Sequence, residues 1–277
     1  MMEHFTANDG LKLAYDVQGE GAPLLCLPGL TRNMEDFDPV VADFADRAQV
    51  IRMDFRGRGA SDYGDPATYS VPQEALDVVH LLDHLGLEKA AILGTSRGGL
   101  VAMMLAGTAK ERLSGVVLND IGPEIMPEGL ANIMDYIGRL PAQNTLAEVA
   151  EALPRLYADS FRNVPPATWA VMAGRLYTEG PDGLALRYDP KLREAVAPAF
   201  APDAPEVDLW PLFDAMDGLP LGLIRGAGSN ILSAATTAEM RRRRPDMLFA
   251  ELPDRGHVPF LDEPPCTHLI SDFLDRL

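Results

Sequence analysis

Cysteine is scarce in this chain of 277 residues, and its only two examples are Cys26 and Cys266. Two cysteines cannot form a disulfide framework, and they share no metal-ligand spacing with the five histidines. We therefore expect a reducing compartment and no metal site.

Long apolar runs are missing as well. No stretch approaches the roughly 18 consecutive apolar residues that a membrane helix requires. The N-terminal residues MMEHFTANDG also lack the basic segment and the apolar segment of a signal peptide. Both absences favour a cytoplasmic protein that does not insert into membranes.

Basic residues are outnumbered, with 24 Lys and Arg against 41 Asp and Glu, which gives a formal net charge of −17. Such an excess of negative charge repels nucleic acid and anionic membrane surfaces. We therefore expect neither as a partner, and we interpret the basic run at 241–244 as a solvated helix end. A homodimer is compatible with this composition.

Strand and helix patterns alternate along most of the chain. The runs at 22–29, 48–55, 89–94 and 113–120 are short and apolar, as buried strands are, and 70–87 has helical periodicity. Strands that alternate with helices predict an α/β fold, with a doubly wound, mostly parallel sheet covered on both faces.

The alternation stops after residue 122 and resumes near residue 211, and the segments between these points look helical, with no evident strand. We therefore predict a core domain of residues 1–122 and 211–277. Residues 123–210 are predicted to form a helical cap, inserted after the sixth strand and placed over the carboxyl ends of the strands, where such folds bind ligands.

Ser96 lies in the pentapeptide GTSRG, between a predicted strand and a predicted helix. In that context G-x-S-x-G is typical of a nucleophile elbow, in which small neighbours allow a strained turn to hold the serine hydroxyl outward. A plain glycine-rich turn is the alternative interpretation. The helix would present its first amide, that of Arg97, to a developing oxyanion.

His257 is the candidate base for Ser96. It lies in a loop directly after the last predicted strand, where a base can reach a serine at the carboxyl end of the sheet. The other histidines are less well placed, because one precedes the first predicted strand and the rest lie on predicted helices: His4, His80, His84 and His268.

Four motifs occur in a recognisable order: CLPGL at 26–30, DFRGRGASD at 54–62, GTSRGG at 94–99 and GHVPFLDEP at 256–264. They resemble the oxyanion loop, the D-x-R-G-x-G-x-S motif, the nucleophile elbow and the histidine loop of the α/β-hydrolases. The resemblance covers nearly the whole chain and points to a capped serine hydrolase of the esterase or lactonase type.

This resemblance implies an α/β-hydrolase fold and a reaction that needs no metal or organic cofactor. It also implies a second oxyanion donor at the backbone amide of Leu30. Pro28 replaces the histidine that the family usually has in this loop, and a backbone donor survives that change. Serine at position 96 disfavours the related haloalkane dehalogenases and epoxide hydrolases, which use Asp there.

The acid of the catalytic triad departs from the common pattern. The family often carries an Asp in a loop G-x-x-S-D, but this chain reads GAGSN and has Asn230 at that place. One interpretation is that Asn230 disables the enzyme, and another is that it orients the imidazole without a charge. In some relatives the acid follows the sixth strand, where this chain has Asp120. We favour Asp120 as the acid, against the alternative that it only caps a turn, and expect Asp254 to brace the histidine loop.

Substrate-binding candidates are Arg97, Trp169 and Met126. The Arg97 guanidinium could bind a substrate carboxylate, but pairing with an acidic residue such as Asp36 or Glu35 is the commoner arrangement. Trp169 and Met126 could line an acyl pocket, although packing of helices on the sheet is the default role for such side chains.

The favoured function is hydrolysis of a small carboxylic ester, thioester or lactone through an acyl-enzyme on Ser96. One alternative is C–C bond hydrolysis of a dienoate, with Arg97 on its carboxylate. Another is a hydrolase-like binding protein with little turnover, which Asn230 keeps open.

Overall fold

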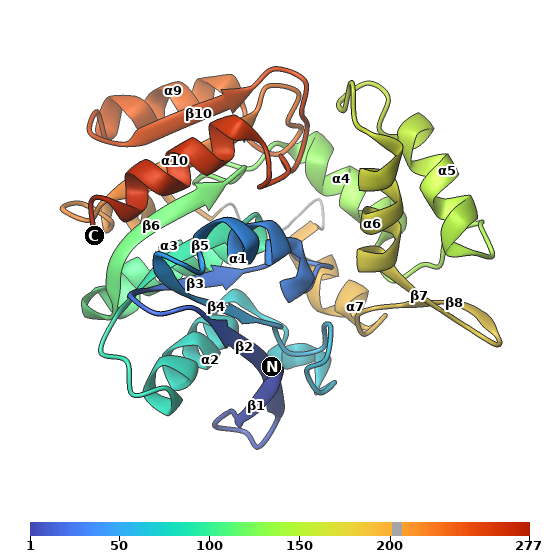
Figure 1. Cartoon of the computed structure of the whole chain (residues 1–277), viewed down its shortest axis with the longest axis horizontal. Helices are drawn as coiled ribbons and strands as arrows, with labels where there is room; N and C mark the ends of the chain where they lie inside the picture. Colours follow the sequence, from blue (N-terminus) through green and yellow to red (C-terminus); the bar gives the residue numbers. More distant parts are fainter. Residues whose placement is uncertain (201–206) are drawn as a thin grey trace.

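An eight-stranded sheet forms the centre of the computed structural model, which describes residues 1–200 and 207–277 (Figure 1). Its strand order is β1-β2-β4-β3-β5-β6-β9-β10, and every pair from β4 onward is parallel. The strands are β1 (Glu3–Thr6), β2 (Lys12–Gln18), β3 (Ala22–Leu27), β4 (Ala48–Met53), β5 (Ala90–Thr95), β6 (Leu113–Asn119), β9 (Leu221–Gly226) and β10 (Leu248–Leu252). The predicted doubly wound α/β fold is confirmed.

The central strands are apolar throughout because both of their faces are covered. Successive side chains of a strand point to opposite faces of the sheet. In β3, Leu25 and Leu27 join one buried cluster, whereas Leu24 and Cys26 join the other.

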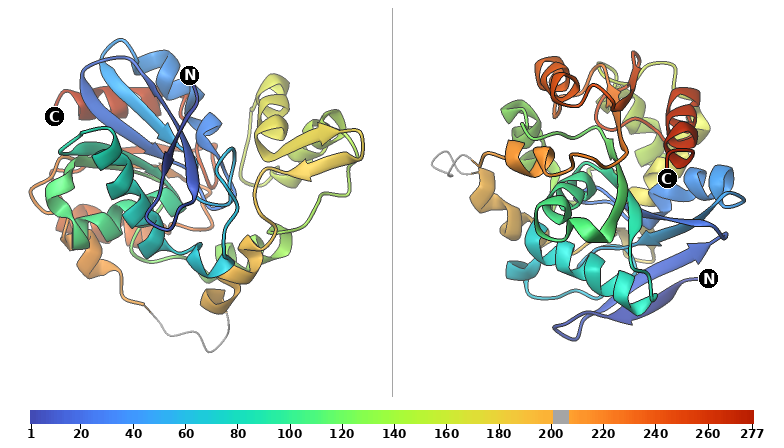
Figure 2. Two further views of the ribbon diagram at one scale, coloured as in Figure 1. Left: turned by 90° about the horizontal axis from the view of Figure 1, so that it is seen from below. Right: turned by 90° about the vertical axis from the view of Figure 1, so that its left-hand side faces the viewer.

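Helices cover both faces, as the right-hand view of Figure 2 shows for α10 and α1 on one side and α2 and α3 on the other. The first face is covered by η1 (Met34–Phe37), α1 (Asp38–Phe44) and α10 (Pro264–Leu274). The second is covered by α2 (Val71–His84), α3 (Arg97–Thr108), α8 (Trp210–Asp214) and α9 (Ala234–Arg243). Short 3₁₀ helices η2 (Pro66–Thr68) and η3 (Lys110–Arg112) lie in loops.

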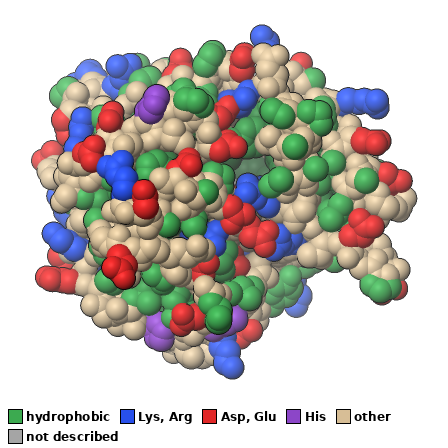
Figure 3. All heavy atoms as spheres, in the orientation of Figure 1, with side chains coloured by type: hydrophobic (Ala, Val, Ile, Leu, Met, Phe, Trp, Pro, Cys, Tyr) green, Lys and Arg blue, Asp and Glu red, His purple; other side chains and the backbone are tan. Residues whose placement is uncertain are grey.

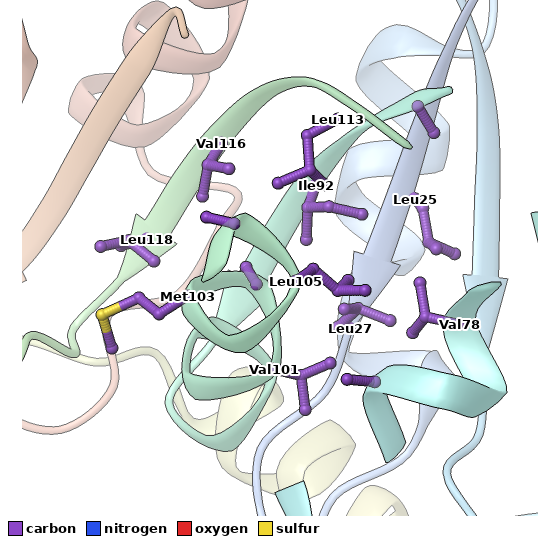
Figure 4. Packing of buried hydrophobic residues seen from close by; sticks show 14 of the residues in the cluster. Leu25, Leu27, Val78, Ile92, Val101, Met103, Leu105, Leu113, Val116 and Leu118 are labelled. Carbon is purple, nitrogen blue, oxygen red and sulfur yellow. The ribbon is translucent and has the colours of Figure 1, made fainter. Parts of the chain in front are cut away.

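Helix α3 packs directly on the second face. Its residues Val101 and Leu105 lie against Leu27 and Ile92 of the sheet (Figure 4). This burial fixes the helix that follows the nucleophile candidate, so the N-terminus of α3 cannot shift without opening the core.

The segment between β6 and α8 contributes no described residue to the large sheet. It forms a separate lobe beside one end of the sheet in Figures 1 and 2. Its elements are α4 (Pro127–Tyr136), α5 (Leu146–Leu156), α6 (Pro166–Leu176), β7 (Tyr177–Gly180), β8 (Gly183–Leu186), α7 (Leu192–Val196) and η4 (Ala197–Phe200).

The hairpin of β7 and β8 corrects the expectation that this segment contains no strand. Each strand has four residues, and none of their side chains is fully buried. A strand this short and this exposed shows no alternation of apolar and polar residues, which is why the sequence pattern missed it.

Strand β1 is a second correction, because His4 lies in it rather than ahead of the fold and pairs with Ala14 of β2. Only Phe5 of its four residues is buried, so the sequence gives no periodic signal there.

Among the helices of residues 1–200 and 207–277, none is long and apolar enough to span a membrane.

Candidate active site

Ser96 occupies the sharp turn between β5 and α3. Its backbone has φ +50° and ψ −111°, which is a strained conformation for any residue other than glycine. The strain is maintained because β5 is buried on one side of the turn and α3 on the other. Ser96 is thereby held at the carboxyl end of the central strands.

The glycines around Ser96 are required by close packing of the backbone. A Cβ atom on Gly98 would lie 2.1 Å from the carbonyl oxygen of Leu27, and one on Gly94 would lie 2.6 Å from that of Gly98. Both distances are far below van der Waals contact, so no larger residue fits without moving the strand or the helix.

His257 lies in the loop between β10 and α10, and its imidazole faces the elbow. Its Nε2 is 2.9 Å from Oγ of Ser96, within hydrogen-bonding distance. A base at this position can accept the hydroxyl proton, which is the first requirement for making serine nucleophilic.

Asp120 lies directly after β6, with φ +57°, and is fully buried. Its Oδ2 is 2.7 Å from Nδ1 of His257. The same carboxylate accepts hydrogen bonds from the Gly226 amide at 2.8 Å and from the Ser229 hydroxyl at 2.6 Å. These donors hold a buried charge in place beside the imidazole.

Asn230 lies one residue beyond Ser229 and takes no part in this arrangement. No hydrogen bond joins its side chain to His257 or Asp120 in the part of the chain that the structure describes. The loop after β9 therefore contacts the acid candidate through Ser229 and not through Asn230.

The amides of Leu30 and Arg97 are the oxyanion-donor candidates. Leu30 follows β3 in the loop beside Ser96, and Arg97 is the first residue of α3. Within residues 1–200 and 207–277, neither amide donates a hydrogen bond to another residue. Two free N–H groups near a serine hydroxyl are what a tetrahedral oxyanion needs.

The Arg97 side chain turns away to α2. Its Nε donates to Oε2 of Glu74 at 2.7 Å, and its Nη2 donates to the carbonyl of Tyr69 at 2.9 Å. The expected acidic partner was therefore misidentified, because Asp36 pairs with Arg32 and Glu35 pairs with Arg187. Glu74 is closer because α2 packs beside α3.

Glu74 also binds a second arginine. Its Oε1 is 2.8 Å from Nη1 of Arg58, and Nε of Arg58 donates to the carbonyl of Leu30 at 2.8 Å. Burial opposes ionisation of Glu74, but the positive charges of Arg97 and Arg58 outweigh it and hold its pKa below the ordinary value. This network thus joins the two residues whose amides are the oxyanion-donor candidates.

Trp169 is buried within the lobe and not open to the site. It stacks on Tyr157 with ring centroids 5.9 Å apart, and Phe260 lies 6.3 Å away. Phe260 follows His257 closely in the chain, so the aromatic cluster connects the lobe to the histidine loop. Met126 is half-buried just before α4, where its amide bonds the carbonyl of Ile231.

Sequence reasoning had assigned no role to Ser229 or Glu74. Ser229 stands in the quoted loop GAGSN, so its hydroxyl was visible as a potential hydrogen-bond donor. Glu74 gave no signal, because its partner Arg97 is 23 residues away and only the packing of α2 on α3 brings them together.

Residues 24–265 match the model of the alpha/beta hydrolase family. The chain is 36% identical to the 3-hydroxybutyrate-oligomer hydrolase of Cupriavidus necator over 265 residues, which covers 91% of this chain and 89% of that protein. It is 27% identical to the 2-(acetamidomethylene)succinate hydrolase of Mesorhizobium japonicum, over 93% of this chain and 90% of that one.

Among solved structures, an alpha/beta hydrolase from Novosphingobium aromaticivorans superposes with a TM-score of 0.92 and 40% sequence identity, covering 100% of this chain and 98% of the other. The structure of E-2-(acetamidomethylene)succinate hydrolase matches with a TM-score of 0.81 and 25% identity, covering 99% and 100%.

Proposed function

Because the chain belongs to the alpha/beta hydrolase family, we propose that it hydrolyses small carboxylic esters through an acyl-enzyme on Ser96. The observation that carries this proposal is the continuous chain of hydrogen bonds from Asp120 through His257 to Oγ of Ser96. It has the order of roles that serine hydrolases use.

In the first half of the reaction, Oγ of Ser96 attacks the ester carbonyl while Nε2 of His257 accepts its proton. The carbonyl oxygen becomes an oxyanion, which the amides of Leu30 and Arg97 stabilise. As the C–O bond breaks, His257 returns the proton to the departing alkoxide. Asp120 stabilises the imidazolium that exists between these two transfers.

Deacylation repeats the same steps with water in place of serine. His257 accepts a proton from the water, which attacks the acyl carbon, and then gives it to Oγ of Ser96 as the acid product leaves.

We further propose that residues 123–210 serve as the cap over this site. Excluding bulk water there strengthens each electrostatic interaction with the oxyanion.

The relative named as a 3-hydroxybutyrate-oligomer hydrolase supports an ester as the substrate class. We extend this to short esters of hydroxy acids, and keep thioesters and lactones as further substrates to test. The dienoate alternative loses its main support, because the Arg97 guanidinium is paired with Glu74. The alternative of a hydrolase-like binding protein with little turnover is weakened because a carboxylate, that of Asp120, already bonds His257.

Labelling and turnover test the proposal together. The parent protein is expected to react with a fluorophosphonate probe and to hydrolyse p-nitrophenyl butyrate, whereas Ser96→Ala should do neither. Ser271→Ala on α10 is the matched control and should behave as the parent. Unchanged turnover in Ser96→Ala, or a parent that is neither labelled nor active, would refute the assignment.

A further inference from the structure

Arg32 lies two residues beyond Leu30, and its side chain runs beside the nucleophile candidate. A Cβ atom placed on Gly29 would be 3.3 Å from Cγ of Arg32 and 3.8 Å from Cβ of Ser96. The side chains of Arg32 and Ser96 therefore both lie next to Gly29. The turn that carries Arg32 is closed by a hydrogen bond from its amide to the Gly29 carbonyl at 3.2 Å.

The guanidinium of Arg32 is only partly used within the protein. Asp36 accepts hydrogen bonds from Nε at 2.7 Å and from Nη2 at 2.6 Å. Nη1 makes no hydrogen bond to another residue of the described chain, and the side chain is 18% exposed. Arginine has five N–H donors in a planar fork, so the edge that carries Nη1 can bind a second carboxylate.

Three tyrosines of the lobe lie within electrostatic range of this cation. They are Tyr136 at the end of α4, Tyr157 at the end of α5 and Tyr177 at the start of β7. For each of them burial raises the pKa, and the positive charge of Arg32 partly opposes that rise. Their phenols are therefore close enough to Arg32 for its charge to act on them.

The region between the lobe and the body of the molecule is open to solvent. Tyr136, at the end of α4, is 49% exposed. Figure 3 shows a hollow between the body of the molecule and the lobe, with hydrophobic, basic and acidic side chains at its edge.

Two arginines of the lobe bond to carboxylates of the core. Arg187 donates to both carboxylate oxygens of Glu35 and to the Gly174 carbonyl. Arg175 donates to Asp38 at 3.2 Å. Arg32, by contrast, belongs to the core, lies beside Ser96 and has an unused donor edge.

We propose that Arg32 binds a carboxylate of the substrate, so that the enzyme prefers esters that carry a free carboxylate besides the ester bond it cleaves. The proposal rests on Ser96 being the nucleophile, as argued above. The chain carries a net charge of −17, which repels an anionic substrate at long range. A local arginine with an unused donor edge supplies the attraction that such a substrate needs.

Three substrates distinguish carboxylate recognition by Arg32 from ester hydrolysis in general. They are the linear dimer of 3-hydroxybutyrate, the same dimer with its terminal carboxylate converted to a primary amide, and p-nitrophenyl butyrate. The parent should cleave the acid about tenfold or more better than the amide in kcat/KM, since a charge-assisted pair is lost in the amide. Arg32→Gln should bring this ratio close to one, and its kcat/KM for p-nitrophenyl butyrate, which carries no carboxylate, should fall less than its kcat/KM for the acid.

Two further variants keep the experiment decisive. Arg47→Gln removes one positive charge from a pair with Asp275 on the surface, and it should leave the acid-to-amide ratio at the parent value. Arg32→Lys retains the charge without the planar fork and should give an intermediate ratio.

The outcomes distinguish the two proposals. A parent that cleaves acid and amide equally well, or an unchanged ratio in Arg32→Gln, overturns the role of Arg32 while leaving ester hydrolysis intact. A parent that cleaves none of the three substrates overturns the ester hydrolase itself. If Arg32→Gln does not fold, the parent's ratio and that of Arg32→Lys decide.

Discussion

Nε of Arg97 donates a hydrogen bond to Oε2 of Glu74 at 2.7 Å, which joins the residue after the proposed nucleophile to a buried carboxylate of α2. The other oxygen of that carboxylate binds Arg58, and both Glu74 and Arg58 are fully buried. One buried carboxylate thus balances two arginines, so its removal leaves buried positive charge unpaired.

We expect Glu74→Gln to lower the free energy of unfolding by about 3 kcal/mol or more, because breaking a buried ion pair on one side is costly. Urea denaturation at neutral pH measures the change. Glu239→Gln is the control, since Glu239 pairs with Arg242 and Arg243 at the surface and should contribute little. A Glu74→Gln variant as stable as the parent would show that the network does not support the fold.

Asp120 is expected to be the acid of the triad. Its carboxylate lies 2.7 Å from His257, whereas Asn230 does not bond that ring. Loss of a triad acid typically lowers turnover by about 10⁴-fold, through the wrong imidazole tautomer and the loss of charge stabilisation. Asp120→Asn should therefore nearly abolish kcat for p-nitrophenyl butyrate.

Asn230→Asp provides the opposite test for the same triad. If Asp120 is the acid, a new carboxylate at position 230 should change kcat little. A gain of orders of magnitude in Asn230→Asp, together with a small loss in Asp120→Asn, would instead mean that Asn230 is a disabled acid. Thermal unfolding of both variants separates loss of chemistry from loss of fold.

The α/β sheet and the nucleophile elbow were predictable because their signals are local. Each buried strand is a continuous apolar run, and the elbow places Gly94, Ser96 and Gly98 within one pentapeptide. The steric reason for these glycines became visible only in the structure, where the Leu27 carbonyl approaches Gly98 from a neighbouring strand.

Contacts between distant elements could not be predicted in the same way. The Glu74–Arg97 pair depends on how α2 packs on α3, and the Arg187–Glu35 pair depends on how the lobe lies against the core. Sequence periodicity identifies which face of a helix is buried, but not which charged side chain it will meet. The short exposed strand β7 was missed for a related reason, since only its pairing with β8 defines it.

Ser229 is expected to hold Asp120 in position for His257. Its hydroxyl donates to Oδ2 of Asp120 at 2.6 Å, the same oxygen that lies beside the imidazole. Ser229→Ala removes one hydrogen bond to a buried charge, worth about 1.5–3 kcal/mol. We expect kcat for p-nitrophenyl butyrate to fall by about tenfold or more, with KM changed little.

Ser233→Ala is the comparison for Ser229→Ala, because Ser233 caps α9 and makes no hydrogen bond to the proposed triad within the described residues. It should cost stability but not kcat. Equal kcat values for the two variants would contradict a positioning role for Ser229.

Glu35 and Arg187 tie the core to the lobe, and their contact should depend on pH. Arg187 donates to both oxygens of Glu35, at 2.5 and 2.6 Å, and these bonds hold the pKa of Glu35 below its ordinary value of 4.5 although burial opposes them. A carboxylate whose pKa is lower in the folded than in the unfolded state stabilises the protein at pH values above its unfolded-state pKa. That stabilisation is lost as the pH falls through the folded value.

Because the Glu35 side chain is 45% exposed, solvent screening limits the pair to about 0.5–1 kcal/mol. Glu35→Gln should therefore lower the free energy of unfolding by this amount at neutral pH, and the difference from the parent should shrink as the pH falls through the lowered pKa of Glu35 in the folded parent. Urea denaturation over a series of acidic pH values measures it. Glu20→Gln, at an exposed glutamate with no ion pair among the described residues, should show no such pH-dependent difference. A difference that persists or grows in acid would mean that Glu35 stabilises the lobe by something other than its charge.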